Sequence, residues 1–216
     1  MSSIRTLALA IATAAIGSAI AAPAFAQDAS GDTASGKRYT IVGGYAHFEP
    51  TRNPVVADTL TKVNGGGAPT LSFSYNFNDN WSIEAWGADK VGHKVEVNGG
   101  KTASFDGQPY SLSGQYHFGA ADNVFRPFVG LGYYEANYTN ESTEGTGVAA
   151  GQRLGIETVK GAVATAGVDL NINPTWFARA DLRYFEGNSD IKLNGAKAGE
   201  AKFNPVMIGV GLGARF

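Results

Sequence analysis

The stretch VMIGVGLGARF, residues 206–216, alternates between large apolar residues and small or polar ones along its whole length. One set consists of Val206, Ile208, Val210, Leu212, Ala214 and Phe216, and the other of Met207, Gly209, Gly211, Gly213 and Arg215. Successive side chains of a β-strand point to opposite faces, so the pattern predicts a strand with one apolar face and one face of mostly small residues.

Seven upstream segments show the same period of two and are separated by clusters of Gly, Asn, Asp and Pro. In one of them, Leu182 and Tyr184 share one face, while Arg179, Asp181 and Arg183 share the other. With the C-terminal segment, the predicted strands are 38–48, 70–77, 81–89, 109–118, 125–136, 160–170, 176–185 and 202–216.

The connections between these strands alternate in length. Short connections at 78–80, 119–124 and 171–175 alternate with long ones at 49–69, 90–108, 137–159 and 186–201. Short periplasmic turns and long extracellular loops are typical of outer-membrane barrels. A closed barrel also leaves no unpaired backbone groups in lipid. The sequence therefore predicts an all-β fold, an eight-stranded antiparallel transmembrane β-barrel in the outer membrane.

Aromatic residues gather near both ends of the predicted strands. Those near the short turns are Phe77, Trp81, Tyr116, Phe118, Phe125 and Trp176, and those near the long loops are Tyr45, Tyr110, Tyr133 and Tyr184. Two aromatic girdles flanking an aliphatic band are expected of a barrel in a bilayer. The alternative interpretation is a set of ordinary core aromatics in a soluble barrel of the lipocalin kind.

The composition excludes several functions. The chain has 216 residues and no cysteine, which excludes disulfides, thiolate metal sites and a catalytic thiol. Its formal net charge of -2 argues against a nucleic-acid partner, which would require a basic excess. Charged residues make up 17%, against roughly 25% in soluble domains.

The N-terminal region has the pattern of an export signal. Arg5 precedes an uncharged run rich in Ala, Leu and Ile that ends in Ala24-Phe25-Ala26, a small-x-small cleavage pattern. We expect residues 1–26 to be a cleaved signal peptide, 27–37 a periplasmic lead-in and 38–216 the barrel. The alternative for the apolar run is an uncleaved membrane anchor of borderline length.

The inward faces of the predicted strands carry charged residues of both signs. They are Glu84, Arg126, Asp169, Arg179, Asp181, Arg183 and Arg215. Buried charges must be paired, so these side chains are expected to meet across the lumen as a polar plug that closes the pore. A catalytic carboxylate cluster is the alternative for the same residues.

Other inward positions are apolar, namely Trp86, Phe128, Tyr134, Phe177, Phe185 and Met207. Together with the long loops above, they predict either an upward-opening pocket for a hydrophobic small molecule or packing that merely closes the top of the barrel.

Several segments resemble the OmpW family of small outer-membrane barrels, in the family's order. They are NWSIE at 80–84, GHK at 92–94, QYHFG at 115–119, FRPFVGLG at 125–132, GVDLNIN at 167–173 followed by Trp176, and GARF at 213–216. The loops 49–69 and 137–159 diverge from the family. Arg183 is also more polar than the resemblance leads us to expect at its position.

The resemblance implies a channel without a cofactor that carries small hydrophobic molecules across the outer membrane. Such molecules would enter from outside and leave sideways into the bilayer, because the lumen is closed below. We expect Trp86, Phe128, Tyr134 and Phe185 to line their path. The resemblance also makes Phe216 a barrel-assembly signal, with outer-membrane lipid, periplasmic chaperones and the barrel-assembly machinery as partners.

Two other functions stay open at this point. One is a structural or adhesive barrel whose loops bind host surfaces, phage or bacteriocins without transport. The other is a lipid-modifying enzyme, which would need a Ser-His-acid or His-Ser arrangement facing lipid. His117, Ser111 and Ser113 instead face the lumen, so we expect no enzymatic activity.

Overall fold

The computed structural model describes residues 36–51, 55–56, 59–60, 62–97, 100–143, 154–156, 158–193, 196–201 and 204–216. The predicted signal peptide at 1–26 and most of the lead-in lie outside these ranges. Among the described residues, no helix is long and apolar enough to cross a membrane.

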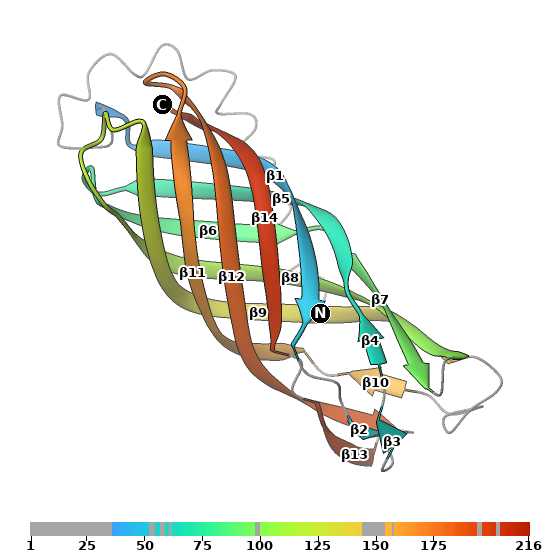
Figure 1. Cartoon of the computed structure of the whole chain (residues 1–216). Coiled ribbons are helices and arrows are strands. Elements are labelled where there is room, and N and C mark those ends of the chain that lie inside the picture. The colour runs from blue at the N-terminus through green and yellow to red at the C-terminus, as the bar shows by residue number, and fades with distance from the viewer. Residues whose placement is uncertain are drawn as a thin grey trace.

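Eight long strands close into an antiparallel barrel (Figure 1). They are β1 (Tyr39–Pro50), β5 (Gly66–Asn76), β6 (Trp81–Ala88), β8 (Gly100–His117), β9 (Phe125–Thr143), β11 (Val159–Asn171), β12 (Trp176–Leu193) and β14 (Pro205–Arg215). Each strand pairs with the next in this order, and β14 pairs with β1 from Thr40↔Arg215 to Pro50↔Pro205. The predicted fold is therefore confirmed.

Within the described residues, six short strands lie at one end of the barrel, opposite the short turns (Figure 1). They are β2 (Val55–Val56), β3 (Thr59–Leu60), β4 (Lys62–Asn64), β7 (Val91–Val97), β10 (Leu154–Ile156) and β13 (Ala196–Ala201). The long connections lie at this end, as predicted, and strand structure continues through parts of all four, which the period-two pattern did not predict. The ladder between β7 and β8, for example, runs from Val91↔Gly107 to Val97↔Gly100. Backbone pairing needs no apolar side chains, so the strands extend past the end of the apolar pattern.

The outward face of the barrel is apolar, as the alternation predicts. Leu131, Ile208, Val210 and Leu212 are exposed side chains midway along their strands. Exposed aromatics lie toward the short turns (Phe77, Trp81, Phe118, Phe125 and Trp176) and toward the opposite end (Tyr45 and Tyr133). These positions are those of the two predicted girdles.

Two of the short turns share the sequence Asn-x-x-Trp, at 78–81 and 173–176. The Asn78 side-chain oxygen accepts hydrogen bonds from the backbone N–H groups of Asn80 (2.9 Å) and Trp81 (2.7 Å). Asn173 does the same for Thr175 (2.9 Å) and Trp176 (2.8 Å). Each side chain thus holds its turn closed from within.

We expect Asn173→Ala to lower the free energy of unfolding by about 1–2 kcal/mol, because two backbone donors lose their acceptor. Asn173→Asp, which keeps an acceptor oxygen in place, is the matched control and is expected to lose less. The measurement is the urea midpoint of the refolded barrel in detergent. Equal losses in both variants would contradict the assignment.

Candidate functional site

The half of the lumen nearer the short periplasmic turns, which we call the lower half, contains a network of ion pairs centred on Arg179 of β12. Its Nε donates to Asp169 Oδ1 on β11 at 2.7 Å, and its Nη2 donates to Asp169 Oδ2 at 3.0 Å. Its Nη1 donates to Glu84 Oε2 on β6 at 3.0 Å. Arg179 therefore joins strands that lie apart in the barrel wall, and all three side chains are buried.

The network extends to both sides through shared carboxylates. Arg183 Nη1 lies 2.9 Å from Glu84 Oε1, and Arg183 Nε donates to Asp181 Oδ2 at 2.9 Å. Arg215 Nη2 donates to Asp169 Oδ2 at 3.1 Å. Six of the seven residues predicted for the plug thus form one continuous chain of contacts from Asp181 to Arg215.

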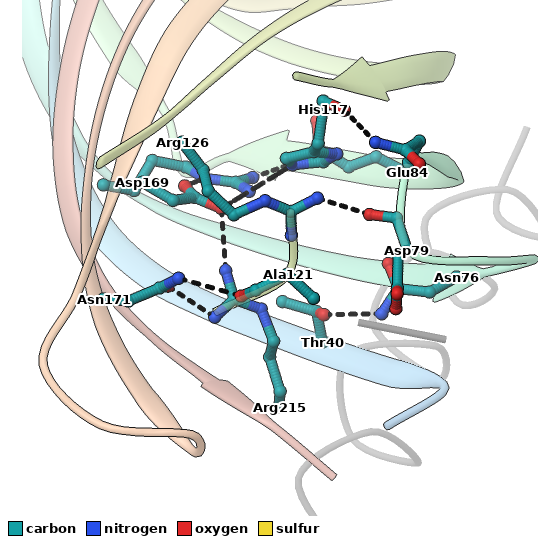
Figure 2. A network of polar contacts seen from close by, with 12 residues as sticks. Thr40, Asn76, Asp79, Glu84, His117, Ala121, Arg126, Asp169, Asn171 and Arg215 are labelled. Carbon is teal, nitrogen blue, oxygen red and sulfur yellow. Dashed lines mark hydrogen bonds and ion pairs between the residues drawn. The ribbon is translucent and has the colours of Figure 1, made fainter. Parts of the chain in front are cut away.

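Arg126, the seventh, lies beside this chain rather than in it. Its Nη2 donates to the backbone carbonyl of Asp79, and its buried Nε has no hydrogen-bond partner (Figure 2). Within the described ranges, no ion pair joins Arg126 to a carboxylate. The side chain lines a polar recess with Asp79, His117, Asp169 and others, which is about large enough for one water molecule.

His117 belongs to this site, although the sequence analysis gave it no role beyond an inward position. Its Nε2 lies 3.6 Å from Asp169 Oδ2 and 3.5 Å from Arg179 Nη2. Its ring stacks on Phe128 with the ring centroids 5.1 Å apart. The alternation placed His117 in the lumen. Phe128 lies directly opposite it in the β8–β9 ladder, whereas Asp169 and Arg179 come from β11 and β12 and reach it only through barrel closure.

The periplasmic mouth is bordered by the residues just before β1. Lys37 donates a hydrogen bond to the Thr175 hydroxyl, which lies in the turn before β12. Asn76 Nδ2 donates to the Lys37 carbonyl at 3.4 Å and to Thr40 Oγ1 at 3.0 Å. Partial burial and then the nearby Arg215 guanidinium lower the pKa of the Lys37 ammonium. The end of the lead-in is therefore attached to the barrel floor.

Above the network lies a cluster of aromatic side chains, which includes three of the four residues predicted for the hydrophobic path. The ring centroids of Phe185 and Tyr134 are 4.9 Å apart, and those of Phe185 and Trp86 are 6.0 Å apart. Phe48 of β1, which the sequence analysis did not single out, lies 6.4 Å from Trp86 and 6.3 Å from Phe185. Ala88, Val91, Ala136, Val159, Val163 and Met207 are among the residues that pack around these rings. We call this set the aromatic cluster.

Phe128, the fourth residue predicted for the path, is not in the aromatic cluster. It is buried lower in the lumen, and the Arg179 guanidinium carbon lies 4.4 Å from its ring centroid. Arg183 forms the boundary between the two halves, with its guanidinium carbon 4.6 Å from the centre of the Trp86 ring. The structure thus groups Phe128 with the ion pairs and Trp86 with the apolar residues above.

The strand pairing is interrupted beside the aromatic cluster. The β6–β8 ladder ends at Gly87↔Tyr110, and pairing with β8 resumes only at Val91↔Gly107. Pro109 lies between these points and has no N–H to contribute to a ladder. On the other side of this segment, the Asp89 N–H donates to the Pro69 carbonyl on β5 at 2.9 Å.

Comparison with known proteins decides the family. The model of the OmpW family matches residues 46–216. The chain belongs to the OmpW family. Outer membrane protein W of Vibrio cholerae is 32% identical over 71% of this chain and 76% of its own length. The protein of the same name from Escherichia coli K12 is 27% identical over 96% of this chain and 99% of its own length.

Solved structures of two outer-membrane proteins show the same architecture. The solution structure of Escherichia coli outer membrane protein W has a TM-score of 0.59 at 26% identity and covers 83% of this chain and 98% of that one. The crystal structure of OprG from Pseudomonas aeruginosa has a TM-score of 0.71 at 23% identity and covers 83% of this chain and 96% of that one. The protein is accordingly located in the outer membrane, with the apolar wall in contact with lipid.

Proposed function

We propose that this OmpW-family barrel passes small hydrophobic molecules from outside the cell into the outer membrane, and that they leave sideways through the wall. The observation that supports it is the division of the lumen. Aromatic rings occupy the upper half, and ion pairs joined by Glu84, Arg179 and Asp169 cross the lower half. An apolar solute has favourable surroundings above and none below.

The ion-pair network favours a sideways exit over passage to the periplasm. To pass downward, an apolar molecule would have to separate Arg179 from Glu84 and Asp169, the two buried carboxylates that share it as a partner. Breaking a buried pair in this way costs about 3–5 kcal/mol, and Arg179 takes part in two pairs. We propose that Glu84, Asp169, Arg179, Asp181, Arg183 and Arg215 act as the plug, with Arg126 beside them.

We propose that solutes leave the barrel at the interrupted pairing around Pro109, because it borders the apolar half of the lumen. It lies next to Ala88, Val91 and Ala136, which are buried members of the aromatic cluster. The buried residues there, Ala88 and Pro109, are small and apolar, and no β6–β8 pairing is present between Gly87 and Val91. Fewer hydrogen bonds have to break for a solute to pass there than at a continuous ladder.

A reversible disulfide crosslink across the interrupted pairing tests this function. The chain has no cysteine, so Ala88→Cys with Pro109→Cys introduces the only two thiols. The readout is the uptake of N-phenylnaphthylamine by intact Gram-negative cells that express the barrel, compared with cells that carry an empty vector. We expect oxidation to reduce uptake to the vector level and a reductant to restore it.

A pair at Leu131→Cys and Ala164→Cys, opposite each other in the continuous β9–β11 ladder, is the matched control. We expect its oxidation to leave uptake unchanged, with crosslinking of both pairs checked by gel mobility. Unchanged uptake through the oxidised 88–109 pair would overturn the lateral exit. Wild-type uptake equal to the vector level would overturn transport and favour a structural or adhesive barrel.

We propose that assembly uses Phe216 as its signal, read by the barrel-assembly machinery after delivery by periplasmic chaperones. Phe216 lies at the seam that closes the barrel. It exchanges backbone hydrogen bonds of 2.9 Å in both directions with Tyr39, and the two rings stack with centroids 5.9 Å apart. We propose that the assembled barrel acts as a channel, without a cofactor and without catalysis.

A further inference from the structure

The inward face of β8 carries a row of buried polar groups without partners. Ser111 Oγ, Ser113 Oγ and both amide atoms of Gln115 have no hydrogen-bond partner. All three side chains are more than nine-tenths buried, with exposures of 6%, 2% and 1%. At least about 90% of buried polar groups in folded proteins are partnered, so unpartnered groups at consecutive inward positions offer hydrogen-bonding capacity to a bound molecule or to water.

The row leads from the aromatic cluster to the ion pairs. Ser111 lies opposite Trp86 on β6 and opposite Tyr134 on β9, so its hydroxyl is placed between two rings of the aromatic cluster. Ser113 lies opposite Glu84 and therefore borders the network. Pro109, at the interrupted pairing, is the next inward position above Ser111 on the same strand.

We propose that the molecules taken up are amphipathic, with an apolar body that packs among the aromatic rings and one uncharged polar end that binds the β8 row. A hydroxyl or an amide fits, because serine hydroxyls both donate and accept and the Gln115 amide offers each function on a separate atom. This inference rests on the proposed function and specifies its substrate class.

The charges around the row exclude a carboxylate as the preferred polar end. Arg179 and Arg183 are already paired with Glu84, Asp169 and Asp181, so neither offers a free cation at this level. Glu84, opposite Ser113, would repel an anion. Arg126 lacks a carboxylate partner among the described residues, but it lines the recess at the periplasmic end.

The test compares cyclohexanol with methylcyclohexane, two probes of similar size that differ in a hydroxyl. Trp81→Phe with Trp176→Phe leaves Trp86 as the only one of the three tryptophans, and its fluorescence reports binding in detergent. Each affinity is calculated from the concentration of the probe within the micelles. The different partitioning of the two probes from water into detergent then does not affect the comparison. We expect cyclohexanol to bind about tenfold or more tightly, as two or three additional hydrogen bonds predict. Cyclohexanecarboxylate is expected to bind more weakly than cyclohexanol.

Ser111→Ala with Ser113→Ala is expected to abolish this preference, and Gln115→Leu to reduce it. Thr40→Val, which removes a lumen hydroxyl at the periplasmic end, is the matched control and should keep the preference. Equal binding of both neutral probes, unchanged in these variants, would overturn the proposal that the transported molecules are amphipathic. Water would then fill the β8 row, and the proposed function would be unaffected. If neither probe gives a saturable fluorescence response, both the proposed function and this inference are contradicted.

Discussion

Arg179→Ala is expected to lower the free energy of unfolding by about 3–5 kcal/mol, because it leaves two buried carboxylates without their shared partner. Asp169 keeps Arg215 at 3.1 Å and Glu84 keeps Arg183 at 2.9 Å, but each loses its contact to the centre of the network. The measurement is urea unfolding of the refolded barrel in detergent, followed by tryptophan fluorescence.

The matched control is Lys160→Ala. Lys160 Nζ lies 3.1 Å from Glu135 Oε1, a distance like those in the network, but the Lys160 side chain is 58% exposed. Exposed pairs contribute less than about 1 kcal/mol, so this variant should unfold close to wild type. A loss in Arg179→Ala no larger than in the control would show that the network contributes little to stability.

The same variant tests the role of the network as a plug. With Arg179 shortened to alanine, nothing in the described part of the chain bridges Glu84 and Asp169 through a single side chain. We expect the ion conductance of reconstituted barrels in a planar bilayer to rise relative to wild type and to Lys160→Ala. Unchanged conductance in a barrel that is still folded would contradict the assignment of the plug.

Gly161→Ala is expected to have the second large effect, a loss of about 1–3 kcal/mol or failure to assemble. A Cβ at this position would lie 1.9 Å from the Glu186 carbonyl oxygen and 2.9 Å from Gly187 Cα on the paired strand β12. These are backbone atoms, so the methyl group fits only if the β11–β12 ladder separates locally.

Gly114→Ala is the control for this substitution, because a Cβ there meets nothing within 4 Å. Gly114 lies on the outward face of β8, and we expect its replacement to be neutral or slightly stabilising. Heat-modifiable gel mobility measures assembly, and urea midpoints measure stability. Wild-type behaviour of Gly161→Ala would mean that the two strands separate there at little cost.

The period of two in the sequence predicted the strands and the faces of their side chains, and the alternating connection lengths predicted the barrel. Glu84, Asp169 and Arg179 were placed in the lumen from alternation alone, and all three lie there. This succeeds because the pleat of a strand assigns faces locally, without reference to other strands. The ends of the strands were less predictable, because ladders such as β7–β8 continue through polar residues.

Contacts across the lumen depend on how the closed strands are staggered, and a single strand carries no information about that stagger. Alternation placed Arg126 and Phe128 inward, but closure set Arg126 beside the ion pairs and Phe128 beneath Arg179. Closure also brought Phe48 to the aromatic cluster and His117 to Asp169. Local patterning thus specified which residues face inward, and barrel geometry selected the partners that reach across the lumen, because those partners come from strands that do not follow one another in the chain, such as β8 and β11 for His117 and Asp169.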